Sequence, residues 1–269
     1  MTKVTDPLVP QPALPSRSPT SGIDVVTTLA HFAIVTYLVD PQSLRRHLHS
    51  RFEPTTVLDD QGRERALVSV VPFLDLDFRL ASCPWPKRRF GQINYRAYVI
   101  DTKTGEHVAW FFGTSLDSVL VNIPRHAWKL PWHRGRIRFD VNFDESRKLH
   151  TKYCMTAKSE WAPAELELED SGRAVHELCG FEDFETGFRL LTHPIIGVFH
   201  RTDGKLGSYS IWHGQMCPTS GNVQHASFPL LDRLGLVEEG SLEENDSVMM
   251  QPVIDFTIYL PPVCLTRQH

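Results

Sequence analysis

Alternation of polar and apolar residues predicts two adjacent strands near the middle of the chain, at residues 90–100 and 107–112, with a turn at Thr104-Gly105. Successive side chains of a strand point to opposite sides, so every second residue shares a face. In the first strand this rule places four polar side chains together: Gln92, Asn94, Arg96 and Tyr98. A polar face flanked by aromatic residues suits the lining of a small-molecule cavity better than a dry core. The pattern therefore predicts a binding pocket on this strand.

Further strands are predicted on both sides of this pair. They are residues 66–73, 136–143, 149–157, 164–169, 195–200, 206–213 and 248–260. The strands at 195–200 and 206–213 form a hairpin that turns at Asp203-Gly204. Helical signals are fewer: an N-cap and proline at Asp40-Pro41, a segment from Asp117, and apolar residues at helical spacing over 180–191. Strands outnumber helices, so the sequence predicts a mainly β (α+β) fold.

The first 22 residues differ in composition from the rest of the chain. They contain five prolines among Ser, Thr and Gln, with little to bury. Such a segment predicts a flexible leader whose removal leaves thermal stability nearly unchanged. Residues 23–269 are then expected to form a single domain.

Composition excludes several classes of function. A formal net charge of −4 and 41% hydrophobic residues in a 269-residue chain favour a globular protein with a substantial core, and argue against a general binder of nucleic acid or anionic membranes. No run is long enough to span a membrane, and no secretory signal is visible. The five cysteines are scattered without a C-x-x-C pair, which is typical of thiols in a reducing cytosol. A cytoplasmic location is therefore expected.

A cluster of basic residues follows the central strands. It comprises Arg125, Lys129, Arg134, Arg136 and Arg138, with no acid between them. Either it is a solvated strand edge, or it is a carboxylate site, because a guanidinium matches a carboxylate with two hydrogen bonds. The interleaved Trp128 and Trp132 suggest base stacking, but the acidic remainder of the chain argues against nucleic acid.

Histidine and lysine offer two kinds of catalysis. The 13 histidines show no compact ligand spacing, so no metal is expected, and acid–base work near neutral pH is the favoured role. A desolvated lysine forms a Schiff base with a ketone, and Lys129 is the candidate nearest the predicted pocket. P-loops, dinucleotide fingerprints and nucleophile elbows are absent from the sequence, so no cofactor is expected.

The order of these segments resembles the YqjF-like proteins, a family of unknown function in the acetoacetate decarboxylase-like superfamily. The matching segments are Val68-Ser69-Val70-Val71-Pro72-Phe73, Ile93-Asn94-Tyr95-Arg96-Ala97-Tyr98-Val99, Val108-Ala109-Trp110-Phe111-Phe112, Pro124-Arg125 with Leu130-Pro131-Trp132, and Trp212-His213. The likeness covers most of residues 23–262. It implies a β-barrel or cone with a few peripheral helices and an internal cavity.

The resemblance also implies a departure from decarboxylase chemistry. Arg125 looks like the arginine of the decarboxylase G-R-E segment, and Pro131 like the proline of the following P-K-K, whose first lysine forms the Schiff base. The glutamate of that segment is His126 here, and the two lysines are Trp132 and His133. The family glutamate before the N-x-R strand is replaced by Gln92. These changes remove the decarboxylase nucleophile and its acidic partner.

Together these features predict a small-molecule enzyme acting on a carbonyl or carboxylate compound by histidine acid–base chemistry, of lyase, hydratase, cyclase or isomerase type. The expected catalytic residues are His126 and His133. The expected substrate-binding residues are Arg125, Arg96, Asn94, Gln92, Tyr98, Trp110, Trp132 and His213. One alternative is a non-catalytic carrier, and another is a decarboxylase or aldolase that uses Lys129. The expected partner is a small-molecule substrate, and both a monomer and a homo-oligomer are compatible with the sequence.

Overall fold

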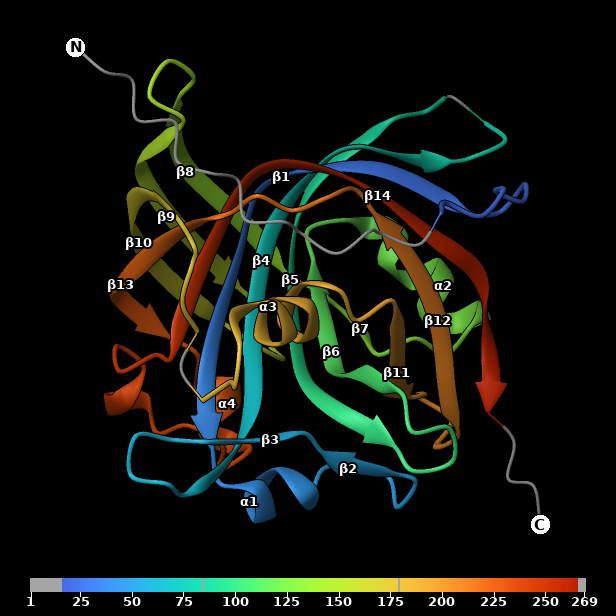
Figure 1. The fold of residues 1–269 in the computed structure, drawn as a ribbon. Helices are drawn as coiled ribbons and strands as arrows, with labels where there is room; N and C mark the ends of the chain where they lie inside the picture. The colour runs from blue at the N-terminus through green and yellow to red at the C-terminus, as the bar shows by residue number, and fades with distance from the viewer. Residues whose placement is uncertain (1–15, 84, 179, 266–269) are drawn as a thin grey trace.

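A computed structural model describes residues 16–83, 85–178 and 180–265 of the chain. Seven strands close into a barrel, because the first strand pairs with both the second and the last (Figure 1). In barrel order they are β1 (Val25–Val39), β4 (Glu64–Leu80), β5 (Arg88–Asp101), β6 (His107–Leu116), β11 (Ile196–His200), β12 (Leu206–His213) and β14 (Ser247–Leu265). Neighbours are antiparallel except β6 and β11, which are parallel. The predicted mainly β barrel is confirmed.

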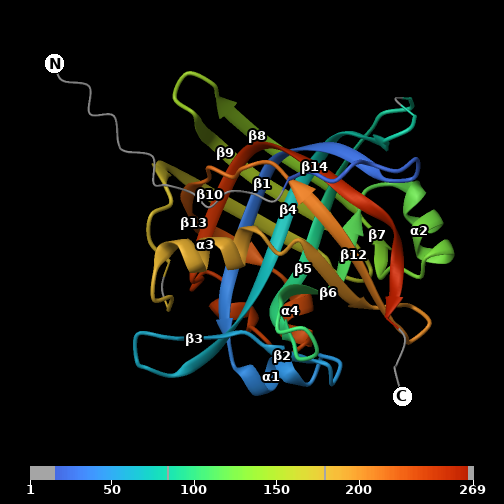
Figure 2. The same cartoon turned by 45° about the vertical axis from the view of Figure 1, so that its right-hand side comes forward.

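The long strand β14 also carries a second set of strands beyond the barrel. These are β13 (Thr219–Ser227), β10 (Ala164–Ala174), β9 (Leu149–Lys158) and β8 (Arg136–Asp144), in that order from β14. Figures 1 and 2 both show them beside the barrel. The main apolar core lies between this extension and the outer face of the barrel, where Tyr95 and Val70 cluster with Tyr153 and Leu166. Burial of these side chains holds the extension against the barrel.

The remaining elements are short. Three strands pair at the barrel margins: β2 (Phe52–Pro54), β3 (Thr56–Leu58) and β7 (Trp132–Arg134). The helices are α1 (Pro41–Arg45), α2 (Asn122–Ala127), α3 (Phe184–Thr192), α4 (Pro229–Arg233) and the 3₁₀ turns η1 (Val119–Val121) and η2 (Glu239–Ser241). No helix of the described residues is both long and apolar enough to cross a bilayer.

Helix α3 covers the inner side of the barrel sheet. Asp183 caps its first turn by accepting a hydrogen bond from the Thr186 backbone N–H at 2.8 Å. Its Phe188 packs in one cluster with Val71 and Tyr98, whose side chains lie on the inner face of β4 and β5. Figure 1 shows the helix in front of these strands. It therefore closes the barrel interior on this side.

Strand β5 divides its side chains as the alternation predicts. Tyr95 and Val99 point outward into the main core, whereas Asn94 and Arg96 point into the barrel. Helices also form after Asp40-Pro41 and within 180–191, as predicted, with Asp40 accepting from the Ser43 backbone N–H at 2.7 Å. The segment after Asp117 contains η1 and α2 rather than one longer helix.

Five strands and part of the leader differ from expectation. Strands β1 and β13 and the three-residue strands β2, β3 and β7 were not predicted, and β1 is a wall of the barrel. Of the predicted leader, residues 1–15 lie outside the described residues. Residues 16–22 are exposed, yet the Arg17 guanidinium lies 5.1 Å from the centre of the Trp212 ring and the Ser18 carbonyl accepts from the Tyr259 hydroxyl at 3.2 Å.

Candidate functional site

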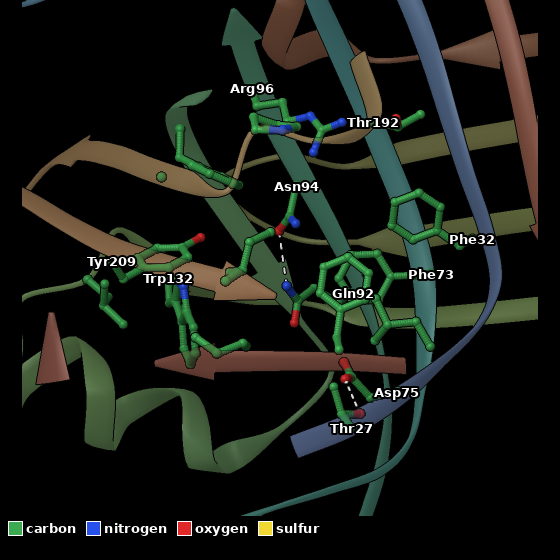
Figure 3. Close-up of a pocket in the computed structure, with 18 of the residues that line it drawn as sticks. Thr27, Phe32, Phe73, Asp75, Gln92, Asn94, Arg96, Trp132, Thr192 and Tyr209 are labelled. Atoms are coloured by element: carbon green, nitrogen blue, oxygen red, sulfur yellow. Dashed lines mark hydrogen bonds between the residues drawn. The ribbon is translucent and has the colours of Figure 1, made fainter. Parts of the chain in front are cut away.

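The barrel interior contains a cavity of about 60 Å³. By the same kind of measure one water molecule needs roughly 10–15 Å³, so the space holds a small ligand. Its walls are mainly apolar and aromatic and include Leu29, Phe32, Phe73, Phe111, Leu130, Trp132, Tyr209, Ile211, Phe256 and Ile258. A few polar side chains interrupt them: Thr27, Asp75, Gln92, Asn94, Arg96 and Thr192 (Figure 3). Apolar walls with a few placed polar groups are typical of small-molecule sites.

Polar residues of β5 form a column along one side of the cavity. Asn94 Oδ1 accepts two hydrogen bonds, from Gln92 Nε2 at 3.0 Å and from Thr114 Oγ1 at 2.9 Å. These bonds fix both amide groups. No described residue bonds to Asn94 Nδ2 or Gln92 Oε1, so one donor and one acceptor remain for a ligand.

Arg96 is a buried cation without a counter-charge. Its residue is only 6% exposed, and no carboxylate of the described residues forms an ion pair with it. Nε and Nη2 donate to the Tyr98 hydroxyl at 3.2 and 3.0 Å, and Nη2 also donates to the Leu191 carbonyl at 2.8 Å. The Tyr98 hydroxyl is itself held by Ser69 Oγ at 3.0 Å. The guanidinium is thus fixed by neutral groups, and Nη1 keeps its donors for a ligand.

Asp75 lies at the other end of the polar column. Figure 3 shows Arg96 and Asp75 at opposite ends, with Asn94 and Gln92 between them. Asp75 is 1% exposed, and its Oδ1 accepts from Thr27 Oγ1 at 2.9 Å, whereas Oδ2 has no protein partner among the described residues. Burial raises the pKa of this carboxyl to about 7, although the Thr27 hydrogen bond acts in the opposite direction.

Among the predicted substrate-binding residues, four line the cavity: Gln92, Asn94, Arg96 and Trp132. Tyr98 lies behind Arg96 and positions it. His213 lies behind the wall, because its ring stacks on Phe256 at 5.0 Å between centroids, while its Nδ1 donates to the Gly214 carbonyl at 2.7 Å. These two residues therefore support the wall rather than form it.

Trp110 lies on the opposite side of the barrel wall. The register of β5 and β6 shifts between Tyr95 and Arg96, so Trp110 pairs with Ala97 and Phe111 pairs with Arg96. Paired residues of antiparallel strands share a face. Trp110 therefore packs outward against the rings of Phe52 and His200, and Phe111 lines the cavity in its place.

Neither predicted catalytic histidine reaches the cavity. His126 is exposed on α2. Alternation along β7 directs Trp132 to the cavity and His133 to the other face, where its ring stacks on Trp161 at 4.0 Å between centroids. Burial, assisted by the Arg125 charge, lowers the pKa of His133 to about 4.

The basic cluster is also outside the cavity. Arg125 is half-buried, and its Nη1 donates to the Trp132 carbonyl at 2.6 Å and approaches His133 Nδ1 at 3.3 Å, so it holds the backbone of β7. Arg134, Arg136 and Arg138 are exposed. Lys129 has a left-handed backbone (φ 59°), and its carbonyl accepts from the Thr202 N–H at 2.9 Å. No described lysine lines the cavity.

Four polar residues of the cavity were not predicted: Thr27, Asp75, Thr192 and Tyr209. For Asp75 a signal existed, because it has the same parity as Val71 and Phe73 in one strand and so shares their face. Burial raises the pKa of the Tyr209 phenol, which favours its neutral, hydrogen-bonding form. No group of three or more His, Cys, Asp or Glu in the described part of the chain is placed to hold a metal.

Solved structures with this fold include enzymes of the acetoacetate decarboxylase-like superfamily. The enduracididine biosynthesis enzyme MppR, complexed with the condensation product of pyruvate and imidazole 4-carboxaldehyde, has a TM-score of 0.58 at 12% identity, covering 91% of this chain and 90% of that chain. Acetoacetate decarboxylase from Legionella pneumophila subsp. pneumophila str. Philadelphia 1 gives 0.56 at 14%, covering 96% and 92%. An acetoacetate decarboxylase-like enzyme from Sphingomonas wittichii RW1 gives 0.58 at 12%, covering 90% and 92%. The predicted fold is confirmed.

No curated protein matches the sequence. The model of the DUF2071 family, described as an uncharacterized conserved protein, matches residues 27–255. This match spans well over half of the chain and includes the whole polar column. With the structural neighbours, it confirms the family resemblance drawn from the sequence. The chain therefore belongs to the DUF2071 family of uncharacterized conserved proteins.

Proposed function

We propose that this protein is an enzyme that binds a small carboxylate compound carrying a carbonyl group inside the barrel, with the carboxylate on Arg96. The observation that carries the proposal is a buried guanidinium with no counter-charge among the described residues. Burying a charge is costly unless it is paired, so an unpaired guanidinium facing a cavity favours an anionic ligand. Two of the structural neighbours are MppR complexed with pyruvate and MppR complexed with the condensation product of pyruvate and imidazole 4-carboxaldehyde, which supports the same ligand class.

The cavity favours proton transfer over imine chemistry. A Schiff base needs a desolvated amine next to the substrate carbonyl, and the described lysines are absent from the cavity wall. What the wall offers instead is a carboxyl group, a phenol and two amides. These groups donate and accept protons or hydrogen bonds. A reaction of isomerase or lyase type without a covalent intermediate is therefore the chemistry that this lining supports.

Isothermal titration with 5-oxohexanoate and with 2-hexanone tests the anion site, because the two probes share a ketone and differ in the carboxylate. We expect the carboxylate to bind and the neutral ketone to bind far more weakly. Arg96→Gln should weaken 5-oxohexanoate binding about 10- to 100-fold, the value of one or two charge-assisted hydrogen bonds. Arg136→Gln is the control, because Arg136 is exposed and lies outside the cavity, and it should not change binding. Equal affinity of wild type and Arg96→Gln would refute the proposal.

Turnover separates an enzyme from a carrier that uses the same cavity. The probe is incubated with stoichiometric protein in deuterated buffer and followed by proton NMR. An enzyme exchanges or converts protons of the ligand, whereas a carrier returns it unchanged. Recovery of an unchanged, tightly bound ligand would favour the carrier.

A further inference from the structure

The anion site and the free carboxyl group are far apart within one cavity. Strands β4 and β5 pair without a break from Val68 opposite Ala97 to Asp75 opposite Phe90, and Arg96 pairs with Ser69. Asp75 is thus six residues further along β4 than the level of Arg96. At about 3.3 Å per residue this is roughly 20 Å along the strand. The guanidinium turns toward Tyr98, away from Asp75, so the side chains do not close this gap.

None of the contacts that Asp75 makes with the described residues requires a charged carboxylate. Its single protein contact, the bond from Thr27, serves a neutral acceptor equally well, and no described cation pairs with it. The contrast is Asp77 on the same strand, which accepts from the Thr28 N–H at 2.8 Å and forms an ion pair with Arg79. A carboxyl group with an orphaned oxygen, on a residue that lines a cavity, favours a role toward a ligand.

We propose that Asp75 is the acid–base residue of this site and that the substrate is an elongated keto carboxylate, which reacts at the end remote from its bound carboxylate. This inference rests on the proposed function of Arg96. The Asp75 carboxylate removes a proton from the carbon beside the ketone, so that an enolate and a neutral Asp75 form. Asp75 then returns this proton to another atom of the same substrate. No oxidant, reductant or second substrate enters the step.

The remaining groups of the column suit this arrangement. Gln92 pairs with Phe73, two residues from Asp75, and its Nε2 keeps one N–H beyond the bond to Asn94, so it is the nearest amide donor of the column to the ketone oxygen on which the enolate charge develops. A carboxyl group that titrates near neutral pH is present in both forms, as an acid–base catalyst requires. Because the carboxylate is held at the opposite end, the bond that joins it to the chain is not the one that breaks. The site therefore supports isomerisation rather than decarboxylation.

Deuterium exchange into a series of keto carboxylates tests the inference without knowledge of the natural substrate. The probes are pyruvate, 7-oxooctanoate and 11-oxododecanoate, whose methyl ketones lie at increasing distance from the carboxylate. The longest of them, with a contact distance added at each end, matches the roughly 20 Å between the levels of Arg96 and Asp75. We expect the protein to accelerate methyl exchange in 11-oxododecanoate and not in pyruvate. Asp75→Asn should slow this exchange about 10²- to 10⁴-fold, the loss expected for a general base, while the Kd of the probe is retained.

Two further variants make the test specific. Asp246→Asn is the matched control, because Asp246 is also a buried carboxyl with a raised pKa but lies outside the cavity, and its exchange rate should equal wild type. Thr27→Val removes the hydrogen bond that favours the carboxylate, so the pH at which exchange is half-maximal should rise.

The outcomes separate this inference from the proposed function. Unchanged exchange in Asp75→Asn, or pyruvate exchanging as fast as the longer probes, would overturn the inference. Intact, Arg96-dependent binding with no exchange in any probe would overturn it as well and leave the anion site standing. Absence of binding by every probe would overturn both.

Discussion

Asp75→Asn should stabilise the protein at neutral pH, although it removes the proposed catalytic group. The unfolded chain ionises Asp75 above a pKa of 3.8, whereas the folded protein keeps the proton until the pH is near 7. Between these values the folded state binds more protons, so its stability falls as the pH rises. The contribution of the neutral carboxyl is complete below pH 3.8 and is lost above pH 7. Asparagine carries no such dependence because it does not ionise.

The magnitude follows from the pKa difference. At about 1.4 kcal/mol per pH unit, a rise from 3.8 to about 7 corresponds to roughly 4 kcal/mol. Near pH 4 the two proteins should be equally stable, because the neutral carboxyl of Asp75 and the amide that replaces it both accept the Thr27 hydrogen bond. At neutral to slightly alkaline pH the variant should be more stable by up to about 4 kcal/mol. A stabilising substitution is expected where a protein keeps a buried ionisable group for its chemistry at a cost in folding stability.

Urea unfolding, followed by tryptophan fluorescence at half-unit steps from about pH 4 to about pH 8, measures this difference. The pH dependence of wild-type stability alone does not isolate the contribution of Asp75, because several histidines also make stability depend on pH. Burial lowers the pKa of His31, His133 and His193 from 6.5 to about 4, so these groups make stability rise between those two values. They are present in both proteins and cancel in the difference. Parallel curves for wild type and variant would refute the reasoning, since they would mean that Asp75 is ionised in the folded state at acidic pH.

Two further predictions concern packing and the lysine. A Cβ on Gly91 would lie 2.8 Å from Ile137 Cγ2, so Gly91→Ala should lower the free energy of unfolding by about 1–3 kcal/mol. Gly214 has open space around it, so Gly214→Ala should leave the free energy of unfolding unchanged. Equal effects of the two substitutions would contradict the close packing of β5 on β8. Borohydride should trap no substrate adduct, and Lys129→Ala should retain binding and exchange, because Lys129 does not line the cavity; a reduced adduct mapped to Lys129 by mass spectrometry would restore the Schiff-base mechanism.

The half of the site on β5 was predictable because strand alternation is a local property. Gln92, Asn94 and Arg96 share a face whatever the rest of the fold does, and a polar face among aromatic residues has few uses other than a cavity. The position of His133 outside the cavity could not be predicted, because it depends on which face of the short strand β7 meets the barrel. That choice is made by pairing with β6, which is a long-range contact.

At Asp75 two sequence patterns disagree, because its parity with Val71 and Phe73 predicts an inward side chain whereas the local hydrophobic alternation predicts an outward one. In β4 the alternation of Leu74 and Leu76 with Asp75 and Asp77 reads as an apolar inner face and a polar outer face. The structure reverses this: Asp75 is buried in the cavity, and Leu76 is 36% exposed. A carboxyl group buried inside a barrel breaks the alternation on which strand prediction depends. Strand β1 was missed for a related reason, since it is buried along most of both faces and shows no alternation.

The closing pair of the barrel, β1 with β14, has a consequence for how the protein folds. Val25 pairs with Ile258, so the two strands are separated by most of the length of the chain. Contacts of such separation form late and slow folding, because a long loop loses entropy before the pairing stabilises it. During synthesis, β1 lacks this partner until β14 leaves the ribosome, at about 5–20 residues per second. For that time an apolar edge strand and the lining of the unfinished cavity stay accessible, and we expect nascent chains to depend on chaperone protection until β14 docks.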